Sequence, residues 1–124
     1  MKLVLASTSA YRRELLQRFG LPFEVARPDI DESPLPDETP QATAERLAVE
    51  KARAVAGQFE DALIIGSDQV AHMGDTRFGK PGTVERAIAQ LQAMSGRTVV
   101  FHTALALLNT RSGRVQLDAV PTEV

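Results

Sequence analysis

The sequence predicts an α/β fold, with a mixed sheet flanked by helices. Short apolar runs such as residues 2–6 and 62–66 alternate with stretches of helical periodicity such as residues 41–58. Residues 99–108 and 115–120 flank a turn-rich segment, which is typical of an antiparallel hairpin. Strands linked by helices favour parallel pairing and the hairpin adds antiparallel pairing, so the predicted sheet is mixed.

The first predicted helix covers residues 9–19 and follows the buried strand at residues 2–6. Ser9 is a good N-cap, because its hydroxyl can accept a hydrogen bond from a backbone N–H of the first turn. Leu15, Leu16 and Phe19 fall on one face, and Gly20 ends the helix.

The remaining elements follow from the same rules. Four prolines and a run of acidic residues predict a loop at 28–40, and the next helix ends near Gly57. The other predicted elements are a strand at 23–26, a hairpin of residues 70–73 and 77–78 around Gly74 and Asp75, and a helix at 83–94 capped by Thr83.

Composition limits the class of protein. A length of 124 residues with 44% apolar residues fits one domain, residues 1–124, with a single core. The net charge of −2 gives no global attraction for a nucleic acid polymer, and the chain contains no cysteine for disulfides or thiolate chemistry. Because no apolar run has transmembrane or signal-peptide length, we expect a soluble cytoplasmic protein with no membrane partner.

The start of the first helix is a candidate phosphate site. The N–H groups of a helix N-terminus carry partial positive charge, and here Ser7, Thr8 and Ser9 add hydroxyls while Arg12 and Arg13 add full charges. An ordinary capped helix with a solvated basic face explains the same residues.

Lys51 is the second informative residue. The apolar stripe of the helix at residues 41–58 is formed by Ala44, Leu47, Ala48, Ala52 and Val55, and Lys51 falls near its middle. A lysine at such a position either extends past the core to water or meets a buried anion.

Asp68 follows the apolar run at residues 62–66, where the sequence predicts the end of a strand. Ligand clefts of open α/β sheets lie beyond the carboxyl ends of strands, and a carboxylate there can hold a divalent cation or take a proton from water. A turn aspartate that bonds its own backbone is the structural alternative.

Five segments, in order, resemble the Maf family of nucleotide pyrophosphatases. They are residues 6–16 (ASTSAYRRELL), Asp31-Glu32, Glu50-Lys51-Ala52, residues 64–70 (IIGSDQV) and Gly79-Lys80-Pro81. The resemblance implies a Maf and inosine-triphosphatase type of fold. Family members continue beyond residue 124, so this chain is expected to hold the N-terminal portion of that fold and to lack its C-terminal part.

The resemblance also implies roles for residues. Asp68 matches the general base, and Glu32 matches a metal-binding glutamate, although a solvated loop carboxylate would explain Glu32 equally well; Asp31 is a weaker candidate. Glu32 and Asp68 could hold Mg²⁺ or Mn²⁺ together with phosphate oxygens. The residues matched to substrate binding are Ser7, Ser9, Tyr11, Arg12, Lys51, Gln69 and Lys80. Lys80 could also be an ordinary surface charge, and Arg13 is a weaker candidate that could be a charge on the helix face.

Two departures from the commonest family pattern indicate a substrate. Tyr11 stands where many members have arginine, and Ser67-Asp68-Gln69 stands where many have Ala-Asp-Thr. Both match the 7-methyl-GTP pyrophosphatase branch. An aromatic ring attracts a stacked cationic base such as 7-methylguanine by roughly 1–2 kcal/mol, although Tyr11 could instead merely pack.

Three alternatives stay open beside this small-molecule nucleotide hydrolase. They are a dTTP/UTP pyrophosphatase of the same family, a non-catalytic nucleotide-binding regulator of septum formation, and an inactive fragment. The family also makes a homodimer plausible. His72 and His102 have no metal-ligand spacing and are interpreted as structural.

Overall fold

The computed structural model describes residues 1–73, 76–78, 85, 88–90, 92 and 98–123. Within them, six strands form one sheet in the order β2-β1-β3-β5-β6, with β4 paired to β3. The strands are β1 (Lys2–Ala6), β2 (Glu24–Ala26), β3 (Ala62–Met73), β4 (Thr76–Phe78), β5 (Val100–Asn109) and β6 (Val115–Glu123). The two helices whose bounds are described are α1 (Ala10–Gln17) and α2 (Pro40–Ala56).

The predicted mixed sheet is confirmed. β1 is parallel to both β2 and β3, whereas β3 with β5, β5 with β6 and β3 with β4 are antiparallel. The β3–β4 and β5–β6 pairs are the two predicted hairpins. Gly74, Asp75 and most of the predicted helix at 83–94 lie outside the described residues. No helix among the described residues is long and apolar enough to cross a membrane.

β3 differs from the prediction in length. The expected separate strands at 62–66 and 70–73 form one strand, because β5 pairs with every residue of it from Leu63 to His72. Asp68 therefore lies inside β3 rather than at its end. The strand that does end here is β1, whose last pair is Ala6 with Gly66.

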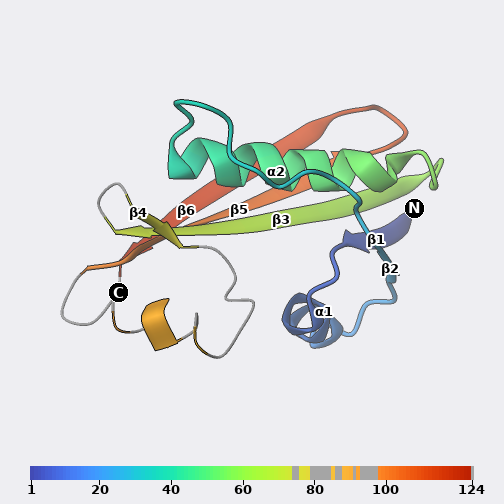
Figure 1. Cartoon of the computed structure of the whole chain (residues 1–124). Coiled ribbons are helices and arrows are strands. Elements are labelled where there is room, and N and C mark those ends of the chain that lie inside the picture. Colours follow the sequence, from blue (N-terminus) through green and yellow to red (C-terminus); the bar gives the residue numbers. More distant parts are fainter. Residues whose placement is uncertain (74–75, 79–84, 86–87, 91, 93–97, 124) are drawn as a thin grey trace.

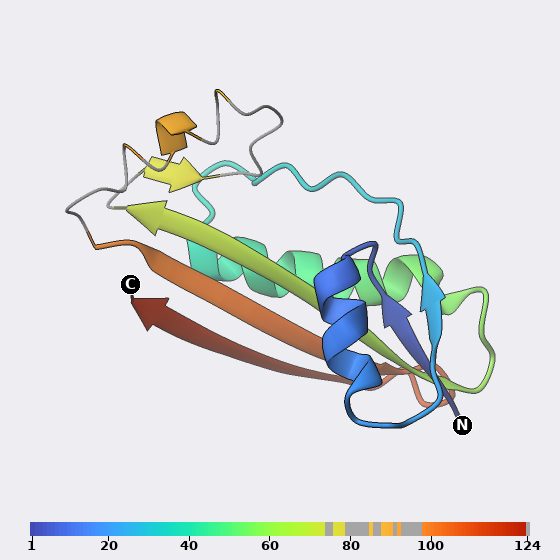
Figure 2. The ribbon, with the colours of Figure 1, turned by 90° about the horizontal axis from the view of Figure 1, so that it is seen from below.

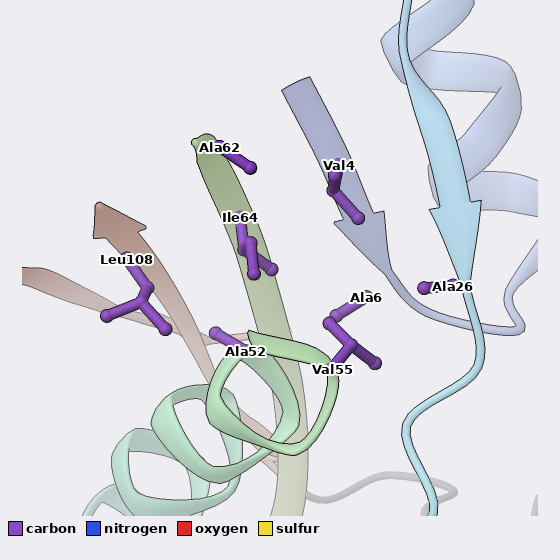
Figure 3. Close-up of a cluster of buried hydrophobic side chains, with 8 residues drawn as sticks. All are labelled: Val4, Ala6, Ala26, Ala52, Val55, Ala62, Ile64 and Leu108. Atoms are coloured by element: carbon purple, nitrogen blue, oxygen red, sulfur yellow. The ribbon is translucent and has the colours of Figure 1, made fainter. Parts of the chain in front are cut away.

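α2 covers one face of the sheet, and α1 lies on the opposite side near β1 (Figures 1 and 2). The core therefore sits between α2 and the sheet, where α2 contributes Ala52 and Val55 and β3 contributes Ile64 (Figure 3). A second cluster joins Ala44 and Ala48 of α2 to β5. The small side chains of α2 indicate that helix and sheet are close.

Gly66 shows how close they are. A Cβ atom on Gly66 would overlap the carbonyl oxygen of Ala48 and lie 2.9 Å from the backbone nitrogen of Ala52. Both obstacles are backbone atoms, which no side-chain rotation can move. Gly66 is therefore the residue that lets the middle of α2 rest directly on β3.

α1 matches its predicted cap but is less buried than the core helix. The Ser9 hydroxyl accepts the N–H of Arg12, and Gly20, with φ of 71°, follows the helix in the left-handed conformation that suits glycine. The helix ends at Gln17 rather than at residue 19, none of its residues is buried, and Phe19 just beyond it is 75% exposed.

We expect Gly66→Ala to lower the free energy of unfolding by about 3 kcal/mol, because the added methyl group must push α2 away from β3. Gly57→Ala is the matched control. Gly57 caps the same helix with φ of −66° and open space around its Cβ position, so alanine should be neutral or stabilise by about 0.5 kcal/mol. Urea unfolding of both variants makes the comparison, and equal stability of the two would contradict the close-contact argument.

Candidate functional site

Lys51 occupies the position that the helical periodicity predicted. It lies on the buried stripe of α2 and is only 8% exposed. Its Nζ atom does not extend to water but meets anions: Asp68 Oδ1 at 2.9 Å and Glu32 Oε1 at 2.8 Å. It also donates to the Ser67 carbonyl at 3.3 Å. Of the two alternatives open for Lys51, the structure therefore shows the buried anion.

Asp68 reaches Lys51 because of its place on β3. Side chains of a strand alternate between the two faces, so Asp68 is on the face of Gly66, which contacts α2. Asp68 is 8% exposed, and its carboxylate bonds the lysine across this interface. The turn-aspartate alternative is thus wrong, since the partner of this carboxylate is a side chain from another element.

Glu32 comes from the loop between β2 and α2. Its carboxylate is half exposed, at 55%, and lies on the Lys51 ammonium. The adjacent Asp31 behaves differently. Its carboxylate accepts the N–H of Ser33 at 2.9 Å, and this backbone bond together with a side-chain bond to Ser33 lowers the pKa of Asp31. Asp31 is therefore engaged in its own loop, while Glu32 belongs to the site.

The sheet leaves an edge open beside these groups. On the side of β3 that faces β1, pairing with β1 stops at Gly66 and pairing with β4 starts at Ala71. Among the described strands, none pairs with residues 67–70 on that side. The chain leaves β1 at this opening, which brings Ser7 and the start of α1 to the carboxyl end of β1. Ligands of open α/β sheets bind in this kind of place.

The predicted phosphate residues lie in the turn that follows β1. Ser7 is buried, and its hydroxyl accepts the N–H of Ser9 at 3.0 Å, while the Ser9 hydroxyl accepts the N–H of Arg12 at 3.3 Å. Arg12 is half-buried and forms no ion pair with a described residue. Tyr11 is 70% exposed, so the residues that the structure describes cover little of its side chain.

Gln69 and Lys80 complete the predicted set. The Gln69 amide donates to Thr103 Oγ1 at 3.2 Å, and strand alternation directs Gln69 away from Asp68 and toward the face where α1 lies. Lys80 lies outside the described residues. The structure therefore joins Glu32, Lys51 and Asp68 directly and groups Ser7, Ser9, Tyr11 and Arg12 at the end of the neighbouring strand.

The residues present fit a divalent cation in part. Two carboxylates, from Glu32 and Asp68, meet at the Lys51 ammonium. Two is the number of carboxylates that Mg²⁺ commonly takes from protein when phosphate oxygens and water supply the rest. The described residues contain no group of three or more acidic, histidine or cysteine side chains that could hold a metal ion. A cation here would therefore need oxygen atoms from its substrate.

Sequence reasoning missed Arg46 and Glu38. The Arg46 guanidinium bonds the Glu38 carboxylate, and this lowers the pKa of Glu38 from its usual 4.5 to about 2 and raises the pKa of Arg46. A signal was available in the sequence. Thr43, Arg46 and Glu50 follow one another at spacings of three and four on α2, beside the apolar stripe.

The histidine pair was also missed. His72 and His102 lie far apart in sequence, but antiparallel pairing of β3 with β5 brings their Nε2 atoms to 2.9 Å. Burial, and then the neighbouring His72, lower the pKa of His102. The pair is a cross-strand contact, and the sequence positions of the two histidines do not indicate it.

Comparison with known proteins supports the resemblance seen in the motifs. A family model described as "Maf-like protein" matches residues 2–124. The chain belongs to the Maf family. It is 68% identical to a 7-methyl-GTP pyrophosphatase of Aromatoleum aromaticum and 63% identical to one of Thiobacillus denitrificans, over 99% and 98% of this chain.

The chain spans 63% and 61% of the length of these two relatives. Among solved structures, it is similar to a HAM1 protein from Coxiella burnetii, with a TM-score of 0.68 and 22% identity over 99% of this chain and 71% of the other. The Ham1 protein of Staphylococcus aureus gives a TM-score of 0.65 at 14% identity. These similarities confirm the α/β fold of the Maf and Ham1 type.

The Glu38 carboxylate predicts an acid-sensitive contribution to stability. Because its pKa is about 2 in the folded chain and near 4.5 when unfolded, its contribution is complete above pH 4.5 and is lost as the pH falls toward 2. The difference in free energy of unfolding between the wild type and Glu38→Gln should therefore shrink over this interval. Urea unfolding at several pH values measures it, and a constant difference would contradict the low pKa.

Proposed function

We propose that this chain is the catalytic-site portion of a nucleotide pyrophosphatase that converts 7-methyl-GTP to 7-methyl-GMP and pyrophosphate and so clears a modified nucleotide. The observation that carries the proposal is the buried Lys51 held between Glu32 and Asp68 beside the open end of β1. Membership of the Maf family and the names of its relatives support the reaction and the substrate.

Binding of the triphosphate would use the start of α1 and the Lys51 cluster. N–H groups of a helix N-terminus favour phosphate oxygens, and Arg12 would add a full charge with two or more donors. Ser7 and Ser9 use their oxygens as acceptors for backbone N–H groups, so each hydroxyl hydrogen stays available to donate to a phosphate. We also assign Lys80 to this set by its match to the family motif.

In the chemical step, a water oxygen attacks the α-phosphorus, the bond from that phosphorus to the bridging oxygen breaks, and pyrophosphate leaves. Asp68 would take the proton of the water. Lys51 binds Asp68 Oδ1, which leaves Oδ2 to accept that proton. The Lys51 ammonium also keeps two carboxylates close together, which otherwise repel each other and the triphosphate.

Glu32 and Asp68 would hold Mg²⁺ or Mn²⁺. When bound, the cation would neutralise negative charge on the phosphate oxygens as the bond breaks. Lys51 has a second role in that arrangement, because an ammonium beside both ligands fixes their positions before the cation arrives. The homodimer suggested by the family stays a prediction.

Asp68→Asn should lower pyrophosphate release at least about a hundred-fold, because amide nitrogen and oxygen cannot accept the water proton at neutral pH. The assay uses Mg²⁺ with 7-methyl-GTP, GTP, UTP and dTTP, and nucleotide binding is measured separately and should persist. Asp118→Asn on β6, which lies away from Lys51, is the matched control and should keep full activity.

The same assay separates the alternatives. Turnover of UTP and dTTP above 7-methyl-GTP would assign the chain to the other branch. Binding without turnover by the wild type would make it a nucleotide-binding protein. A separate thermal unfolding measurement tests the inactive fragment, which would show no cooperative transition. Unchanged turnover in Asp68→Asn would contradict the role given to Asp68.

Tyr11 should select the cationic base. Tyr11→Arg is expected to lower kcat/KM for 7-methyl-GTP roughly ten-fold relative to GTP, since a stacked ring attracts the charged base while arginine repels it. Tyr11→Phe keeps the ring and should keep the preference. Equal losses for both nucleotides would show that Tyr11 does not contact the base.

A further inference from the structure

We propose that Arg46 is a positioning residue, which holds Glu32 against Lys51 by fixing the loop that carries Glu32. The proposal rests on the proposed function, in which Glu32 is a ligand of the divalent cation. Arg46 lies on α2, about 1.4 turns before Lys51. Its guanidinium contacts three parts of the chain: Glu38, Glu50 and the Ser33 carbonyl.

The contact with Glu38 is a two-point one. Arg46 Nε lies 2.7 Å from Glu38 Oε2, and Arg46 Nη2 lies 3.1 Å from Glu38 Oε1. Such forked pairs fix direction as well as distance, because the guanidinium is planar. The side chains are only 20% and 10% exposed, so water screens this pair less than an ordinary surface pair.

Glu38, which Arg46 holds in place, also binds other groups of the loop and of the start of α2. The same Oε1 atom accepts the N–H of Leu35 at 3.1 Å and the hydroxyl of Thr43 at 2.7 Å. The turn between them is completed by Asp37, whose φ of 62° lies in the left-handed region that aspartate tolerates better than most residues. Glu38 therefore closes the segment from Leu35 to Thr43 around one carboxylate.

A third bond reaches the residue next to Glu32. Arg46 Nη2 donates to the Ser33 carbonyl at 3.0 Å, across 13 residues of sequence. Glu32 reaches Lys51 from the loop, and its side chain is half exposed where it does so. The reach of Glu32 toward Lys51 depends on where the backbone at Ser33 lies. Asp31 binds the N–H of Ser33 within the loop, whereas Arg46 ties the carbonyl of Ser33 to α2, the helix that carries Lys51.

Arg46 and Lys51 lie on the same helix, which links the loop contacts of Arg46 to the position of Lys51. Arg46 and Lys51 project from one rigid helix, and Glu50 bonds Arg46 Nη1 at 3.0 Å, which orients the guanidinium further. The helix thus carries both the ammonium that Glu32 binds and the guanidinium that brings Glu32 to it. Glu32 lies on a loop, but this loop is thereby tied to the helix that carries Lys51.

The test compares Arg46→Gln with Arg53→Gln, an exposed arginine of the same helix, in the full chain. Two quantities are measured: hydrogen exchange at the Leu35 amide by NMR, and the dissociation constant of Mn²⁺ by electron paramagnetic resonance with a non-hydrolysable α,β-imido nucleotide present. Neither requires turnover. Arg46→Gln should exchange at least ten-fold faster and bind Mn²⁺ at least ten-fold more weakly, and Arg53→Gln should match the wild type.

Glu38→Gln is the second variant, used if Arg46→Gln does not fold, and it should reproduce both changes because it removes the other half of the pair. Unchanged Mn²⁺ affinity in the folded variants would overturn the proposal, even if exchange or the melting temperature changed, since Arg46 would then only stabilise the loop. Failure of the wild type to release pyrophosphate contradicts the proposed function alone and leaves this binding test intact.

Discussion

The close contact between α2 and β3 at Gly66 is the constraint on which the rest of the structure depends. Because position 66 has no side chain, the backbone of α2 at Ala48 and Ala52 can lie directly on the strand. Lys51, between those two residues, is thereby brought within hydrogen-bond distance of Asp68, two residues further along β3. A larger residue at position 66 would separate the helix from the sheet and open the core and the Lys51 cluster together.

Charge is arranged around this contact in two connected layers. Lys51 lies between Asp68 from the sheet and Glu32 from the loop, and Arg46 lies between Glu38 and the Ser33 carbonyl of the same loop. Both cations come from α2 and both act on the loop that precedes it. A buried ammonium with two carboxylates is costly to desolvate, and such arrangements are better explained by function than by stability.

Much of the fold and of the candidate site could be predicted from the sequence. Helical periodicity placed Lys51 on the buried stripe, and the hydroxyl at Ser9 gave the start of α1, because both depend on local spacing. The continuous β3 could not be predicted, because Gly66-Ser67-Asp68 resembles a turn until β5 pairs along it. The spacing of Arg46 and Glu50 on α2 was a local signal, but the pairs of Arg46 with Glu38 and of His72 with His102 could not be predicted, because the path of the chain forms each of them.

The most direct measurement is the anomalous diffraction of manganese in a crystal of this chain with Mn²⁺ and a non-hydrolysable α,β-imido analogue of 7-methyl-GTP. We expect one manganese peak bonded to carboxylate oxygens of Glu32 and Asp68, with the triphosphate at the start of α1 and Lys51 beside it. A manganese peak away from both carboxylates, or a triphosphate bound elsewhere on the chain, would contradict it.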